Sequence, residues 1–131
     1  MNRKEFFSRL LLGIPGLHLA KQAFTAPVTK EVILMHPCVA GFSYYDGPDT
    51  RLNLKEQQPL RLQRQPGNPF DKNAVEIFAC TAKLGYLPRK ENKLIARMMD
   101  QGMEVKARIC RINLQNPDWK NVRVEVYVEK T

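Results

Sequence analysis

Residues 122–129 read VRVEVYVE, and they decide the fold because apolar and polar side chains alternate through them without a break. Alternation with a period of two places the two sets of side chains on opposite faces of a β-strand. Residues 60–64, which read LRLQR, show the same pattern, and residues 105–112 alternate roughly. These three stretches therefore predict strands that bury one face and expose the other.

Further strands are expected nearer the N-terminus. Residues 31–45 carry two apolar pieces, VILM and CVA, on either side of Pro37, and this run ends at two tyrosines. A strong turn signal, DGPD, follows at residues 46–49. Residues 74–79 and 84–87 read as two short strands on either side of a turn.

One helix is expected before the last two strands. Pro88 fits its first turn, where a missing N–H costs nothing, and Gly102 is a natural stop. About six short strands with one or two helices make a mostly β domain, and such strands hide their edges best in an OB-like β-barrel. Apolar residues recur at helical spacing at Leu94, Ile95, Met98 and Met99.

The composition favours a single soluble domain that meets polyanions. The chain has 131 residues and a formal net charge of +8. The charge is not confined to the N-terminus, because residues 28–131 hold 17 basic and 12 acidic side chains. Such a balance is typical of proteins that bind nucleic acid or an anionic membrane face, the alternative being a soluble surface that is merely basic.

Residues 1–27 read as a leader that precedes a domain at 28–131. A charged start followed by phenylalanines and leucines outlines a secretory signal, and NRKEFF at residues 2–7 is similar to a twin-arginine signal with one arginine replaced. A packing helix or an unstructured leader are the alternatives, and no membrane span is expected. The cytoplasm is the expected compartment and export the alternative. Mass spectrometry of the mature N-terminus distinguishes them.

The most distinctive stretch is NPFDKNAVEI at residues 68–77, followed by LGYLPR at residues 84–89. It is a polar, rigid loop that leads into a buried strand. Asn68, Asp71 and Asn73 can bond to backbone groups or to a ligand, so Asx turns are the alternative to a binding role.

These pieces, with GFSYY at residues 41–45 and LQR at residues 62–64, make the chain similar to HIRAN domains from about Val39 to Val128. The order and spacing of several motifs make the resemblance specific. It implies an OB-like barrel that binds single-stranded DNA and grips its 3′-hydroxyl end. One departure weakens the contact, because Ser43 stands where a DNA-binding member carries arginine.

The resemblance implies a role for several residues. Tyr44 stands where a base-stacking tyrosine sits, and Asp71 would accept a hydrogen bond from the 3′-hydroxyl. Aromatic side chains beside basic ones agree with this, because they provide stacking platforms and phosphate contacts. The predicted nucleic-acid-binding residues are Tyr44, Tyr45, Arg64, Asn68, Phe70, Asp71, Lys72, Tyr86, Arg89 and Lys90.

No enzyme, cofactor or metal site is expected. The sequence has no phosphate-binding loop, and its three cysteines and two histidines show no zinc spacing. ATPase and RING modules of multi-domain relatives are not present, so their activities are not carried over. The expected partner is single-stranded DNA or a DNA 3′ end, with RNA as a second polymer and DNA repair as the process. The alternative is an exported or envelope protein-interaction module on the same barrel.

Overall fold

The computed structural model describes residues 29–113 and 122–130, and Lys30–Lys130 form one structural unit. Residues 1–28, which include the predicted leader, lie outside the described residues. The described part holds one α-helix, α3 (Lys93–Asp100), and two short 3-10 helices, η1 (Phe42–Tyr44) and η2 (Thr50–Leu52). Its strands are β1 (Lys30–Met35), β2 (Pro59–Arg64), β3 (Val75–Ala79), β4 (Ala82–Tyr86), β5 (Lys106–Ile112) and β6 (Val122–Lys130).

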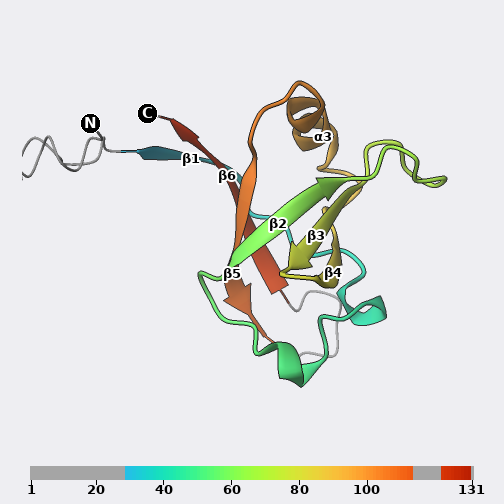
Figure 1. Ribbon diagram of the computed structural model, residues 1–131, viewed down its shortest axis with the longest axis vertical. Helices are drawn as coiled ribbons and strands as arrows, with labels where there is room; N and C mark the ends of the chain where they lie inside the picture. Colours follow the sequence, from blue (N-terminus) through green and yellow to red (C-terminus); the bar gives the residue numbers. More distant parts are fainter. Residues whose placement is uncertain (1–28, 114–121, 131) are drawn as a thin grey trace, which may run out of the picture. The chain divides into compact units, whose positions relative to one another are not determined.

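The strands form one antiparallel sheet in the order β1-β6-β5-β2-β3-β4 (Figure 1). β2 connects its two halves, because Pro59 and Leu60 pair with β5 whereas Arg61–Arg64 pair with β3. Figure 1 shows β2 running obliquely to β5 and β6. A strand that changes partner along its length bends the sheet, as barrels require.

The two edges of the sheet are joined by the chain that follows β1. Cys38 forms an isolated bridge with Arg123 of β6, and Ala40 forms one with Tyr86 of β4. The Ala40–Tyr86 bridge has two backbone hydrogen bonds, of 2.8 and 3.0 Å. The sheet is not closed by a continuous strand pair, but this segment makes it barrel-like. The predicted mostly β, OB-like fold with six strands and a helix is thereby confirmed, and the expected CVA strand is reduced to bridges.

The core follows the predicted alternation. Val122, Val124 and Val126 are fully buried, whereas Arg123 between them is exposed. Apolar residues from the other strands, from η1 and from α3 complete one cluster, so the helix packs on the same core as the sheet. Its largest fully buried side chains besides the valines are Phe42, Ile77, Leu84, Leu87, Ile95 and Ile109.

Two boundary predictions were wrong. Pro88 is not in the first turn of the helix, because a separate turn precedes it, in which the Glu91 N–H donates to the Pro88 carbonyl at 2.9 Å. The helix begins only after Asn92, whose buried side chain is held by the 68–73 loop. The first strand ends at Met35, next to the interruption predicted at Pro37, but the second apolar piece does not continue as a strand to the tyrosines, because Gly41 adopts a left-handed φ of 75° and starts η1.

Gly102 follows the helix with a φ of 86°, as its predicted role as a stop requires. Among the residues that the structure describes, no helix combines the length and the apolar character that crossing a membrane needs.

Candidate functional site

A hollow of about 490 Å³ lies where three separate segments meet. The segments are residues 40–45, the loop 65–74 and the end of β4 with the turn after it. Six of the ten predicted binding residues line this hollow: Tyr45, Asn68, Phe70, Asp71, Tyr86 and Arg89. The other residues that line it are Ala40, Gln65, Pro69, Ala74 and Leu87.

Asn68 shapes the loop at the mouth of the hollow. Its side-chain oxygen accepts hydrogen bonds from the backbone N–H of Phe70 at 2.8 Å and of Asp71 at 3.1 Å, and its amide donates to Gln65. Such Asx bonding fixes the backbone without help from a strand. Phe70, on this loop, is 80% exposed. Such exposure is unusual for a large apolar side chain and typical of a contact surface.

Asp71 joins the loop to the start of α3. One carboxylate oxygen accepts from the Asn73 backbone N–H at 2.9 Å, and the other accepts from the Asn92 side chain at 2.7 Å. Asn92 is only 1% exposed, so this bond satisfies a buried amide. Each carboxylate oxygen has a second lone pair, so Asp71 closes its turn and keeps acceptor capacity at the hollow.

A lysine contacts two of the tyrosine rings that line the hollow. The ammonium of Lys83 is 4.4 Å from the ring centre of Tyr45 and 4.2 Å from that of Tyr86, and the rings meet edge to face at 5.8 Å. Lys83 also donates to the Tyr86 hydroxyl at 2.7 Å and pairs with Glu76 at 3.1 Å. The Tyr86 hydroxyl in turn donates to Gln65 at 2.8 Å.

Two groups of this network, Tyr45 and Lys83, have raised pKa values. Burial raises the pKa of the Tyr45 hydroxyl, and the opposing attraction of Lys83 is smaller. Burial opposes the charge on Lys83, but its hydrogen bonds to Tyr86 and Glu76 outweigh this and hold its pKa above the ordinary value. Both shifts favour the protonated forms, the phenol of Tyr45 and the ammonium of Lys83.

The remaining predicted residues lie outside this hollow. Tyr44 in η1 is 86% exposed and does not line it, and Lys90 is exposed in the turn before α3. Lys72 faces a different hollow beside α3. Arg64 is largely buried, bonds to both carboxylate oxygens of Asp100 at 2.8 and 3.2 Å, and donates to two backbone carbonyls of the 72–74 segment.

Several residues of the site were not predicted. Lys83 and Tyr86 lie three apart in β4, and strict alternation puts such residues on opposite faces. The β3–β4 register shifts opposite Ile77 and Phe78, so an extra residue in β4 brings both side chains to one side. Gln65 contacts Tyr86, Glu76 contacts Lys83 and Asn92 contacts Asp71, and no local pattern in the sequence identifies these partners.

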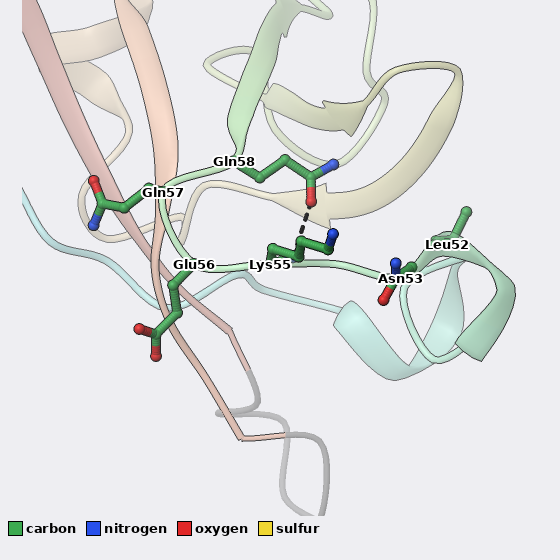
Figure 2. Close-up of a pocket in the computed structure, with 6 residues that line it drawn as sticks. All are labelled: Leu52, Asn53, Lys55, Glu56, Gln57 and Gln58. Atoms are coloured by element: carbon green, nitrogen blue, oxygen red, sulfur yellow. Dashed lines mark hydrogen bonds between the residues drawn. The ribbon is translucent and has the colours of Figure 1, made fainter.

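A further hollow of about 430 Å³ lies in the loop before β2 (Figure 2). It is lined by Leu52 and five polar residues that sequence analysis did not single out, and the Lys55 backbone N–H donates to the Gln58 side chain at 3.0 Å. Over the described ranges 29–113 and 122–130, no group of three His, Cys, Asp or Glu residues is placed to hold a metal ion.

Comparisons with known proteins find one matching family model and two curated relatives. The family model for the HIRAN domain matches residues 38–131. The helicase-like transcription factor of Oryctolagus cuniculus is 33% identical over 63 residues, which are 47% of this chain and 6% of that protein. The helicase-like transcription factor of Mus musculus is 29% identical over 80 residues, which are 58% of this chain and 8% of that protein. The chain thus matches only a small part of each curated relative.

Two solved structures share the fold. A protein from Lactobacillus plantarum has a TM-score of 0.68 and 27% identity, and the match covers 79% of this chain and all of that one. The HIRAN domain of human HLTF has a TM-score of 0.61 and 21% identity, and the match covers 77% of this chain and 80% of that one.

Proposed function

The chain belongs to the HIRAN domain family, and on that premise we propose that it is a non-catalytic nucleic-acid-binding module for single-stranded DNA with a free 3′-hydroxyl end. The terminal nucleotide enters the hollow between Tyr45, Phe70 and Tyr86. Asp71 accepts a hydrogen bond from the 3′-hydroxyl, and Arg89 lies against a phosphate. The other modules of helicase-like relatives supply any catalysis there.

One observation carries the proposal: the hollow brings Asp71 together with aromatic rings and Arg89 from three segments. An ionised carboxylate only accepts hydrogen bonds, so it favours a hydroxyl and repels a terminal phosphate. Exposed Tyr44 and Phe70 offer rings on which bases can stack. The net charge of +8 attracts the strand from a distance.

Fluorescence anisotropy with labelled eight-nucleotide strands tests end recognition. We expect the wild type to bind a 3′-hydroxyl strand roughly tenfold more tightly than the same strand with a 3′-phosphate, about 1.4 kcal/mol. Asp71→Asn removes the repelling charge, so it should abolish this preference. Equal affinity of the wild type for both ends would overturn end recognition, and no binding at low salt would overturn nucleic-acid binding. An RNA strand of the same sequence tests the choice of polymer.

Tyr44→Ala is expected to weaken binding without affecting the fold. Stacking of a base on an aromatic side chain contributes about 1–3 kcal/mol, so affinity should fall about 5-fold to more than 100-fold. The free energy of unfolding should stay within about 0.5 kcal/mol, because the ring is 86% exposed. Tyr44→Phe keeps the ring and should bind like the wild type. If Tyr44→Phe loses as much affinity as Tyr44→Ala, stacking is not the contact.

A further inference from the structure

A second hollow, of about 360 Å³, lies beside helix α3 and is strongly basic. Lys93 and Arg97 are four residues apart on the helix, so they share one side of it. Lys72 reaches the same hollow from the 68–73 loop. The hollow is lined by Lys72, Asn73, Lys93, Arg97, Asp100 and Gln101.

The positive charge of this hollow is uncompensated. Its one carboxylate, Asp100, is held by Arg64 at 2.8 Å, and this guanidinium keeps the pKa of Asp100 below its ordinary value. Over residues 29–113 and 122–130, no carboxylate lies within ion-pair distance of Lys72, Lys93 or Arg97. Like charges four apart destabilise a helix slightly, so an anion in the hollow would relieve an existing repulsion.

The loop at residues 68–73 separates this hollow from the candidate site. Phe70 and Asp71 line the first hollow, whereas the next two residues, Lys72 and Asn73, line the second. Arg64 donates to the backbone carbonyls of Lys72 at 3.0 Å and Ala74 at 2.7 Å while it holds Asp100. One guanidinium thus ties the loop to the C-terminal end of α3, so the basic side chains are attached to rigid backbone before any ligand arrives.

We propose that this basic hollow binds the phosphates of the same nucleic-acid strand, upstream of the 3′ end held in the first hollow. The inference rests on the proposed function and extends it: the module takes several nucleotides rather than the last one alone. A strand that leaves the first hollow across the loop meets Lys72 and then Lys93 and Arg97. Three cations are suited to neutralise up to three backbone phosphates.

The test compares a dinucleotide with an eight-nucleotide strand, both with 3′-hydroxyl ends, by anisotropy or calorimetry from 50 to 200 mM salt. Each phosphate contact contributes about 0.7 to the slope of log affinity against log salt for single strands. For the wild type, the longer strand should therefore show a slope steeper by about 2 and an affinity roughly tenfold higher.

For the long strand, the double variant Lys93→Gln/Arg97→Gln should lower the slope of log affinity against log salt by about 1.4 and weaken binding roughly tenfold. Its affinity for the dinucleotide should be unchanged. Both side chains are exposed, and glutamine is a good helix former, so the fold is retained. Lys55→Gln is the matched control. Lys55 lies before the start of β2 (Figure 2), whereas Arg64, which holds Asp100 at the basic hollow, lies at the end of this strand. β2 spans roughly 17 Å at about 3.3 Å per residue, so the control removes a positive charge at the far end of the strand from the basic hollow.

Each other outcome overturns a specific statement. If the double variant binds the long strand with wild-type affinity and slope, or loses dinucleotide binding by the same factor, the basic hollow is not a separate phosphate site. If the wild type binds both lengths equally, this inference fails while the proposed function stands. If the wild type binds neither strand at 50 mM salt, the proposed function fails and this inference with it.

Discussion

Gly85→Ala is expected to lower the free energy of unfolding by about 3 kcal/mol or more. Gly85 has a φ of 150°, which side chains other than hydrogen rarely allow, and holding alanine there costs on the order of 1–3 kcal/mol. A Cβ at this position would also lie 2.3 Å from the Ala40 carbonyl oxygen and 2.7 Å from a Val39 methyl. That oxygen accepts the hydrogen bond from the Tyr86 N–H that joins this segment to β4, so the substitution pushes residues 37–40 away.

Thermal and urea unfolding measure this effect. For a domain of this size, about 3 kcal/mol corresponds to a fall in melting temperature of roughly 12–24 °C. Gly67→Ala is the matched control, because its Cβ would meet nothing within 4 Å, and we expect a change within about 0.5 kcal/mol. If Gly85→Ala is as stable as the wild type, the segment from Pro37 to Ala40 can shift at little cost and does not hold the edges of the sheet together.

The elements of this fold were predictable where the signal is local. The alternation in residues 122–129 predicts a strand because every second residue is apolar. Val122, Val124 and Val126 of this pattern are the residues that the strand buries in the core. The start of α3 was not predictable, because a tertiary contact decides it. Asn92 is buried against Asp71, which lies 21 residues earlier, and this leaves Pro88 in a separate turn.

The loop residues of the candidate site were predictable from the sequence, whereas the positions of its charged side chains were less so. Asn68, Phe70 and Asp71 lie together because they are neighbours in sequence, and Tyr86 joins them through the β3–β4 pairing. Arg64 shows why basic residues are harder to place. Alternation places it on the same face of β2 as Leu60 and Leu62, and there, beside Asp100, its donors are directed to the protein itself.

Lys83→Met is the second substitution with a large expected effect. It leaves the carboxylate of Glu76, which is only 8% exposed, without its cation. Removing one partner of a fully buried ion pair costs about 3–5 kcal/mol, and because this pair retains some exposure, we expect about 2 kcal/mol. The substitution also removes the ammonium between Tyr45 and Tyr86, so their rings lose a shared contact and binding of the 3′-end should weaken several-fold.

A second change separates these two effects. Adding Glu76→Gln to Lys83→Met removes the stranded charge and should restore most of the stability. Binding should stay weak in the double variant if Lys83 orients the rings, and should recover if the lost affinity merely reflected a less stable fold.

The pH dependence of stability gives an independent check on the same network. The pKa of Lys83 is raised in the folded protein, so its contribution is fully present below the unfolded pKa, near pH 10, and is lost as pH rises through the folded pKa. The raised pKa of Tyr45 acts in the same direction, because the folded state keeps a proton that the unfolded state releases. The wild type should therefore lose stability above about pH 10, and Lys83→Met should lose less over the same range. Identical alkaline profiles would mean that Lys83 is not coupled to folding, and the role assigned to it between the two rings would be wrong.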